Sequence, residues 1–168
     1  MKYSRRRSGF TLLELVVTSA LMATLITSAT VLLRTSQNAW AVAGSEQVKI
    51  DSANATLRHL IRQLRQAEGV ESISEPTDTS AKIVVRMPDG SQRTWQLTGT
   101  TTEYRNGSTG AYTPLANDVD KMIFVGYQAD GATATQVPGD IQMVRCTIIV
   151  DIFGSQEELT TSVWLRAF

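Results

Sequence analysis

The fold is decided by residues 5–33, which read RRRSGFTLLELVVTSALMATLITSATVLL. The 24 residues from Phe10 to Leu33 contain a single charged side chain, that of Glu14. As a helix that rises 1.5 Å per residue, this apolar run would be about 36 Å long, whereas the hydrocarbon core of a bilayer is about 30 Å thick. The sequence therefore predicts one membrane-spanning helix close to the N-terminus.

The charges around the apolar run predict its orientation. Lys2, Arg5, Arg6 and Arg7 precede the run, and no acidic residue lies among them. Basic flanks stay on the cytoplasmic side of a membrane, so the rest of the chain is expected outside the cytoplasm. Without residues 1–9 the chain would keep 12 basic and 16 acidic residues, a net charge of −4. Such a composition does not favour a nucleic-acid partner, for which we expect a basic domain.

Three kinds of segment share this general pattern. A secretory signal peptide has a short apolar region before a small-residue cleavage site; this run is longer, although Ser19-Ala20 and Thr27-Ser28-Ala29 offer small residues. A plain single-pass anchor is the second possibility. The third is a precursor that is cut after Gly9, and it alone explains why an aromatic residue and a spaced acid follow that glycine.

The residues RRRSGFTLLELVV, from Arg5 to Val17, resemble the processing site of type IV prepilins. The resemblance rests on Gly9, Phe10 and Glu14, and on residues 11–13 between them. It implies that a prepilin peptidase cuts after Gly9 and methylates the new N-terminal Phe10. It also implies that Glu14, the fifth residue of the mature chain, guides assembly.

A carboxylate within a membrane helix also has a physical cost. An ionised acid there costs a few kcal/mol on insertion scales, so it usually has a partner. Cleavage after Gly9 would create an amine at Phe10, cationic at neutral pH, which could pair with Glu14 of a neighbouring subunit. Alternatively, Glu14 lies near the cytoplasmic interface and its carboxylate reaches water.

The helical pattern continues beyond the apolar run. No Pro or Gly occurs from Phe10 until Gly44, and the next glycine is Gly69. We predict a helix of about 88 Å that ends near Glu68, with Gly69 as its stop and a bend or local melting at Gly44. Its amphipathic half, residues 34–68, carries one apolar stripe that consists of Ile50, Ala53, Leu57, Leu60, Ile61, Leu64 and Ala67.

Polar residues of the amphipathic half are expected at its surface. Arg58, Arg62 and Arg65 lie opposite the apolar stripe and are typical of a solvated face. His59 has no second histidine, cysteine or acid within a turn, so we expect a helix-surface residue. The single cysteine, Cys146, excludes an intramolecular disulfide and is expected on the core face of a strand.

From Val70 onwards the pattern becomes alternating. After a connecting loop over Val70–Ser80, we predict strands at Lys82–Met87, Gln92–Thr98, Thr101–Arg105, near Tyr112, and at Met122–Gln128, Val144–Ile152 and Leu159–Leu165. A tight hairpin turn is expected at Asp89-Gly90, Asn106-Gly107 signals another hairpin, and an exposed loop is expected at Ala129–Gly139. Five to seven antiparallel strands after one long helix predict an α+β fold, in which one sheet packs on the apolar stripe.

This order of elements is similar to the pilin fold. A single cysteine cannot close the C-terminal disulfide loop common in type IV pilins, which favours the pseudopilins of type II secretion systems. Residues 115–131, LANDVDKMIFVGYQADG, and the ending Leu165-Arg166 resemble the J-type minor pseudopilins, which belong to a complex at the filament tip. The final Ala167-Phe168 departs from that family, where a polar residue is more usual.

No catalytic or metal-binding motif was found in the sequence. One histidine and one cysteine, 87 positions apart, do not indicate a nucleophilic pair or a transition-metal site. Asp118 and Asp120 lack the ligand density of a calcium loop. We therefore expect neither an enzyme nor a bound metal or cofactor.

The sequence thus predicts a structural subunit of a secretion pseudopilus. The expected parts are a cytoplasmic leader (1–9), a transmembrane assembly helix (10–33), its amphipathic continuation (34–68) and a periplasmic β domain (69–168). Expected partners are other pilin or pseudopilin subunits, the prepilin peptidase and an inner-membrane assembly platform, with a separate ATPase as motor. The alternatives are a minor pilin of a type IV pilus or DNA-uptake machine, and a signal-anchored ligand-binding module outside the cytoplasm.

Overall fold

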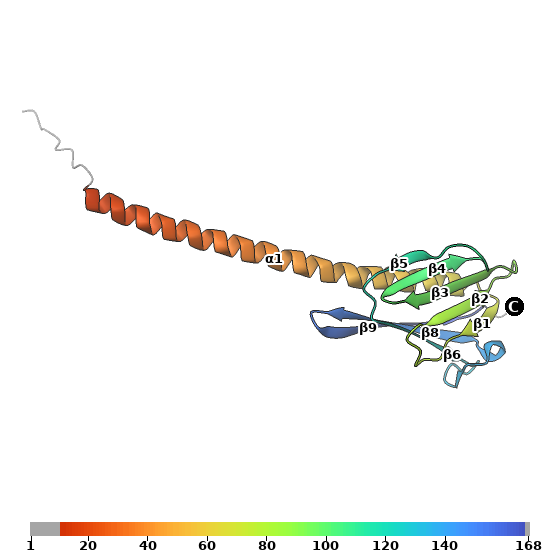
Figure 1. The fold of residues 1–168 in the computed structure, drawn as a ribbon. Helices are drawn as coiled ribbons and strands as arrows, with labels where there is room; N and C mark the ends of the chain where they lie inside the picture. Colours follow the sequence, from red (N-terminus) through yellow and green to blue (C-terminus); the bar gives the residue numbers. More distant parts are fainter. Residues whose placement is uncertain (1–10, 167–168) are drawn as a thin grey trace, which may run out of the picture. The chain divides into compact units, whose positions relative to one another are not determined.

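The computed structural model describes residues 11–166, which fall into two compact units that meet between Gly44 and Ser45. The helix α1 (Leu12–Leu64) contributes its first part to unit 1 and its last part, from Ser45, to unit 2 (Figure 1). The other elements belong to unit 2: β1 (Gly69–Ile73), β2 (Lys82–Arg86), β3 (Gln92–Thr98), β4 (Thr101–Asn106), β5 (Thr113–Ala116), β6 (Lys121–Tyr127), β7 (Ala134–Thr135), a 3-10 turn η1 (Pro138–Asp140), β8 (Met143–Ile152) and β9 (Ser155–Trp164).

The strands of unit 2 form two antiparallel sheets. Five strands make a meander in the order β1-β2-β3-β4-β5, and four make a second sheet in the order β7-β6-β8-β9. The α+β prediction of one long helix packed on antiparallel strands is confirmed. The expected single sheet of five to seven strands is wrong, because β5 is an edge of the first sheet and β6 lies between β7 and β8 in the second, so the two strands are not neighbours.

One hydrophobic core joins α1 to both sheets. Ala53, Leu60 and Leu64 of the helix are fully buried, together with Trp95 of the first sheet and Phe124 of the second. The predicted stripe is confirmed in its centre, whereas Ile50 and Ile61 at its margins are only half-buried. Since a helix position must recur every three to four residues to stay on one face, this spacing sets which side of α1 the sheets cover.

The end of α1 differs from the prediction. The helix ends at Leu64 rather than near Glu68, and Gly69 is the first residue of β1 instead of a helix stop. The amide of Ala67 donates to the Leu64 carbonyl (3.0 Å), which tightens the last turn, and the amide of Glu68 already donates to the Arg86 carbonyl (2.8 Å). The chain therefore begins to pair with β2 although the apolar helical pattern of the sequence continues to Ala67. Gly44 remains within the helix.

Two segments predicted as loops contain strands. Within the predicted loop Val70–Ser80, β1 pairs with β2 through an irregular register near Val70 and Ser72. That irregularity interrupts the alternation of inward and outward side chains within a five-residue strand. The sequence of β1 therefore lacks the pattern by which a strand is predicted. In the predicted loop Ala129–Gly139, β7 is only two residues long and is set by its contact with Gly126. A Cβ at Gly126 would lie 2.6 Å from Cδ1 of Ile141.

The turn at Asp89-Gly90, the hairpin signalled by Asn106-Gly107 and the remaining strands are confirmed, although Asn106 still pairs with Arg93 and the six residues 107–112 separate β4 from β5. The Asp89 carboxylate accepts the Ser91 amide (2.9 Å) in the turn between β2 and β3, and Gly107 follows β4 with φ 94°. A turn of two residues joins β8 to β9, with φ 54° at Phe153 and 79° at Gly154. The left-handed conformation costs a residue such as phenylalanine roughly 1–2 kcal/mol.

Cys146 lies on the core face of β8, as predicted. It is fully buried and unbonded. Burial away from water raises the pKa of its thiol, because the thiolate would lose its hydration. The residue therefore acts as a small apolar side chain in the core.

Substitution of Leu60 tests how strongly the stripe of α1 holds unit 2 together. Leu60→Ala removes a fully buried side chain and is expected to lower the free energy of unfolding by about 2–5 kcal/mol. Thermal melting of the detergent-solubilised chain measures the effect. The control Arg58→Lys, at an exposed position, should stay within about 0.5 kcal/mol; equal effects of both variants would contradict the proposed core.

Candidate functional site

The candidate site begins where α1 begins. Thr11 precedes the first helical residue, and its hydroxyl oxygen accepts the Glu14 amide (3.3 Å). This is one half of a Thr-x-x-Glu capping box. The motif was not predicted, although the three-residue spacing of Thr11 and Glu14 is present in the sequence. The cap starts the helix at Leu12 and places Glu14 in the first turn, where the positive end of the helix dipole favours an anion.

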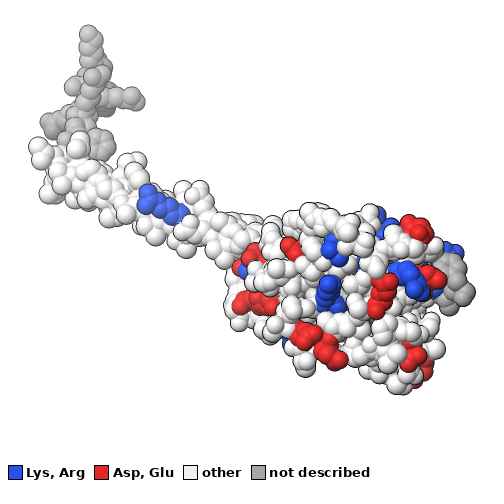
Figure 2. All heavy atoms as spheres, turned by 45° about the vertical axis from the view of Figure 1, so that its right-hand side comes forward, with Lys and Arg blue, Asp and Glu red and all other residues white. Residues whose placement is uncertain are grey.

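The apolar side chains of unit 1 are uncovered by the rest of the chain. Leu12 is 83% exposed, Leu32 70% and Trp40 77%, although these are the side chains that folding normally removes from water. In Figure 2 the described surface of unit 1 is white over most of its length, whereas blue and red atoms are spread over unit 2. This part of α1 needs an apolar environment that the chain does not supply.

The hydroxyl groups of the same segment find hydrogen-bond acceptors within their own helix. Seven hydroxyl groups donate to backbone carbonyls three or four residues earlier, at distances of 2.7–3.1 Å: those of Thr18, Ser19, Thr24, Thr27, Ser28, Thr30 and Thr35. A donor that bonds within its own helix can enter hydrocarbon without a partner from water. The helix therefore contains a stretch that is long and apolar enough to cross a membrane.

Glu14 is the exception on this apolar surface. Within residues 11–166, its carboxylate makes no ion pair or hydrogen bond, although its backbone carbonyl accepts the Thr18 hydroxyl (2.7 Å). The other predicted site residues, which are the cleavage pair Gly9 and Phe10 and the leader charges Lys2, Arg5, Arg6 and Arg7, lie outside the described residues. The structure thus positions Glu14 within a capped first turn and leaves the pairing of its carboxylate as a prediction.

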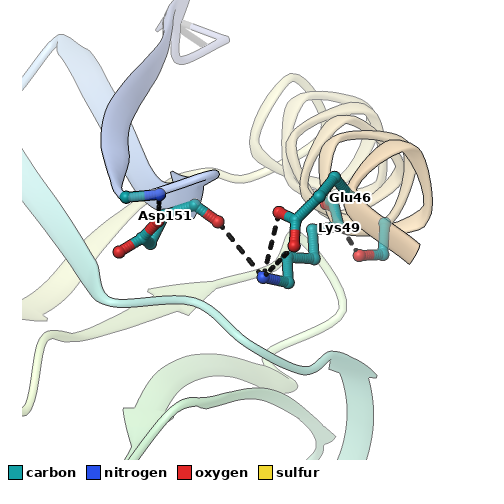
Figure 3. Close-up of polar contacts among 5 residues, drawn as sticks. Glu46, Lys49 and Asp151 are labelled. Atoms are coloured by element: carbon teal, nitrogen blue, oxygen red, sulfur yellow. Dashed lines mark hydrogen bonds and ion pairs between the residues drawn. The ribbon is translucent and has the colours of Figure 1, made fainter. Parts of the chain in front are cut away.

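A polar contact fixes the start of unit 2. Lys49 Nζ donates to both Glu46 oxygens (3.0 and 3.1 Å) and to the backbone carbonyl of Asp151 (3.2 Å), as Figure 3 shows. The Glu46 carboxylate raises the pKa of Lys49, and the charges of Asp118 and Asp151 act in the same direction. The contact ties α1 to the end of β8, where Asp151 also accepts the Gly154 amide.

The acids considered for calcium lie beside this contact without forming a metal site. Asp118 lines an open cleft of about 350 Å³ together with Lys49 and Leu115. The backbone amide of Asp120 donates to the Ile149 carbonyl (2.9 Å), and both aspartates are exposed. Within residues 11–166, no three histidine, cysteine or acidic side chains are grouped so as to hold a metal ion.

The position of His59 differs from the prediction. It is half-buried between α1 and the first sheet rather than an isolated surface residue. Trp95 Nε1 donates to His59 Nδ1 (3.3 Å), and the rings of His59 and Tyr104 meet edge to face at 4.7 Å. Burial lowers the pKa of His59, and the charges of Arg62 and Arg93 lower it further. The sequence could not show this because Trp95 and Tyr104 are distant along the chain and become cross-strand partners only in the sheet.

The lowered pKa of His59 predicts a pH dependence of stability. The folded chain holds this imidazole neutral, so its contribution is present above the unfolded pKa near 6.5 and is lost as the pH falls towards the lower folded pKa. His59→Gln, which keeps an acceptor for Trp95 but does not titrate, should show a smaller fall in Tm between about pH 7.5 and about pH 5.5 than the native chain. Equal falls in the two proteins would contradict this role.

The comparison with known proteins bears on the N-terminal segment. Residues 4–30 match the prokaryotic N-terminal methylation motif, and a search of curated proteins found no relative that matches the chain. The match covers the leader arginines Arg5, Arg6 and Arg7, the predicted cleavage pair and Glu14, together with most of the apolar run. The motif implies processing by a prepilin peptidase and assembly with other pilin subunits, which are structural proteins rather than enzymes. With the apolar helix it indicates a single-pass membrane anchor, and over residues 4–30 the chain is similar to type IV pilin-like proteins.

Proposed function

We propose that this protein is a minor pseudopilin, a structural subunit of a type II secretion pseudopilus, and that it is of the J type. The observation that carries the proposal is the apolar surface of α1 from Leu12 to Leu33, exposed throughout and interrupted by one carboxylate. A lone anchor needs only apolar side chains. A carboxylate in the first turn is explained when the helix also has to recognise another subunit.

The pseudopilin class is supported by features of unit 2. The single cysteine is buried and unbonded, so the disulfide-closed loop common in type IV pilins has no counterpart here. The J type is supported by residues 115–131, which supply β6 and the Asp130-Gly131 turn of the resemblance. Pilin-like order, with the helix first and antiparallel strands after it, is present in the fold.

The proposed parts follow the charges and the fold. Residues 1–9 form a cytoplasmic leader, and residues 10–33 form the segment that spans the inner membrane and later packs in the filament. Residues 34–68 comprise the amphipathic continuation of the helix and the turn after its end at Leu64, and residues 69–168 form a periplasmic β domain. Platform proteins in the inner membrane and a separate ATPase would lift the subunit from the bilayer. In this step the subunit itself would supply the apolar surface of α1 and the charges near its N-terminus.

Assembly is proposed to depend on the pair formed by Glu14 and a cleaved N-terminus. Cleavage after Gly9 leaves an amine on Phe10, and a neighbouring subunit presents its Glu14 carboxylate. Each charge is costly in lipid when alone, and the two offset that cost when they meet. The energy gained by pairing therefore favours one stagger between adjacent helices over others.

Processing gives a direct prediction. When the chain is co-expressed with a prepilin peptidase, intact-mass measurement should show the loss of residues 1–9 and the gain of one methyl group. Gly9→Leu, which blocks access to the cleaved bond, is the matched control and should remain uncut. An uncut native chain would support the signal-anchored binding module instead.

Glu14 gives the second prediction. Glu14→Ala should be inserted and cleaved normally, because the change makes the helix more apolar, but should be lost from filaments for want of a partner for the Phe10 amine. Sheared filaments and membranes are compared by immunoblot, with Leu13→Ala as an uncharged control. Normal incorporation of Glu14→Ala would refute the assembly role.

A further inference from the structure

Trp40 is a large aromatic side chain that lies outside both the apolar run and the core of unit 2. It belongs to the part of α1 within unit 1, seven residues beyond Leu33, and is 77% exposed, whereas Trp95 in the core is 1% exposed. An indole ring has an apolar body and one N–H donor, so it is most stable where one side is apolar and the other is wet. The described part of the chain leaves most of this ring uncovered.

Trp40 continues a row of apolar side chains that begins inside the apolar run. Ile26, Leu33 and Trp40 follow one another at intervals of seven residues, so they lie on one side of α1 with a drift of only about 20° per interval. Their exposed fractions are 63%, 64% and 77%. The row is therefore continuous with the surface that needs lipid, and it extends beyond the end of the apolar run.

The residues that follow the apolar run, 34–38, are polar. They read RTSQN and are all exposed. The Thr35 hydroxyl donates to the Val31 carbonyl (3.0 Å), but the guanidinium and the amide side chains of this stretch need partners that hydrocarbon does not offer. Polar side chains followed by an exposed tryptophan are typical of the headgroup layer of a membrane, where both are stable.

The surroundings of Trp40 leave its ring open to lipid. A shallow hollow of about 290 Å³ is lined by Trp40 and by three small residues, Ser36, Ala39 and Ala43. Long side chains on a helix point towards the preceding turn, so the ring lies nearer to the apolar run than its own Cα does. The ring is thus directed towards the membrane-spanning segment.

The charges of unit 1 set the distances. Between Thr11 and Gly44 the charged residues are Glu14 and Arg34, which are 20 residues apart. In a helix this separation is about 30 Å, equal to the thickness of the hydrocarbon core. When Arg34 lies at the outer edge of the hydrocarbon, the Trp40 Cα lies about 9 Å beyond that edge. Its ring, which points back, then falls within a headgroup layer of about 5–8 Å.

We propose that Trp40 inserts its ring into the headgroup layer on the extracytoplasmic side of the membrane, where it sets the depth of α1 together with Arg34. Lipid is the occupant of this surface because the surface continues the membrane-spanning segment without a break. Arg34 resists movement towards the cytoplasm, which would bring its charge into hydrocarbon. Trp40 resists movement outwards, which would bring its ring into water.

This anchor goes beyond the proposed function and does not depend on it, since it requires only the membrane span. It also bears on Glu14. At the depth set by Trp40, Glu14 lies at the inner edge of the hydrocarbon and enters it when the helix moves outwards. On the proposed function, that movement is the step in which the carboxylate most needs a cationic partner.

Quenching by brominated lipids tests where the ring lies. The full-length chain is placed in vesicles of phosphatidylethanolamine and phosphatidylglycerol whose acyl chains carry bromine either near the headgroup or near the chain end. The emission of Trp40 is the difference between the native chain and Trp40→Ala, because Trp95 and Trp164 are present in both. This emission should be shifted to shorter wavelength than that of tryptophan in water. Bromine near the headgroup should remove more of it than bromine near the chain end.

A tryptophan at residue 26 is the matched control for depth. Ile26→Trp combined with Trp40→Ala places the ring on the same side of α1, about 21 Å further into the membrane. Its emission should be removed mainly by bromine near the chain end. If neither lipid quenched this ring, α1 would not span the bilayer and the proposed anchor would be overturned with the span.

Three other results would also overturn the anchor. Emission of Trp40 that resembles tryptophan in water and is quenched by neither lipid would place the ring in water. Stronger quenching from the chain end would place it in hydrocarbon. A shift to shorter wavelength that disappears when the chain is diluted with more lipid would assign the ring to a contact with another protein subunit.

The test separates this anchor from the proposed function. Intact mass after co-expression with the prepilin peptidase reports cleavage after Gly9, and neither quenching measurement depends on that cleavage. A cut chain whose Trp40 lies in water refutes the anchor alone. An uncut chain whose Trp40 lies in the headgroup layer refutes the pseudopilin function alone.

Discussion

The apolar surface of α1 between Leu12 and Leu33 is the constraint on which the rest of this protein depends. Folding covers none of it, so the segment must be covered first by lipid and then, on the proposed function, by other subunits. The hydroxyl groups along it bond to their own helix and therefore do not resist transfer between these two apolar environments. On the proposed function, the Glu14 carboxylate would distinguish the two environments, because the Phe10 amine of a neighbouring subunit would be its partner in a filament and hydrocarbon offers none.

In unit 2, by contrast, the apolar face of α1 is covered by the chain itself. Its part of α1 carries one apolar face, and two sheets close over that face in a single core. Lys49 links the helix to the β8–β9 hairpin, and His59 links it to β3 and β4, so each sheet has its own polar contact with the helix besides the shared core. Hydrogen bonds of this kind add less stability than the apolar burial, but they fix how the helix is rotated against the sheets.

The surface of unit 2 separates charge rather than pairing it. Within the described residues, Glu46 pairs with Lys49 and Glu68 with Arg86, whereas most of the other charged side chains on the sheets and the helix form no such pair. On the proposed function, charges without a partner in their own chain would help unit 2 to recognise neighbouring subunits in one orientation.

Local rules in the sequence were enough to determine the long helix, its apolar run, its buried stripe, the turn at Asp89-Gly90 and most strands. Each depends on residues within a few positions of one another: the 3.6-residue period, the alternation of strands and the chemistry of tight turns. The Thr11 cap belongs to the same class, since its partner Glu14 is three residues away. Tertiary structure alone decided that the strands form two sheets, that β1 ends the helix early and that His59 meets Trp95 and Tyr104. These features depend on which distant strands pair. The free energy of that pairing comes from contacts throughout the core, so no short stretch of the sequence is enough to predict it.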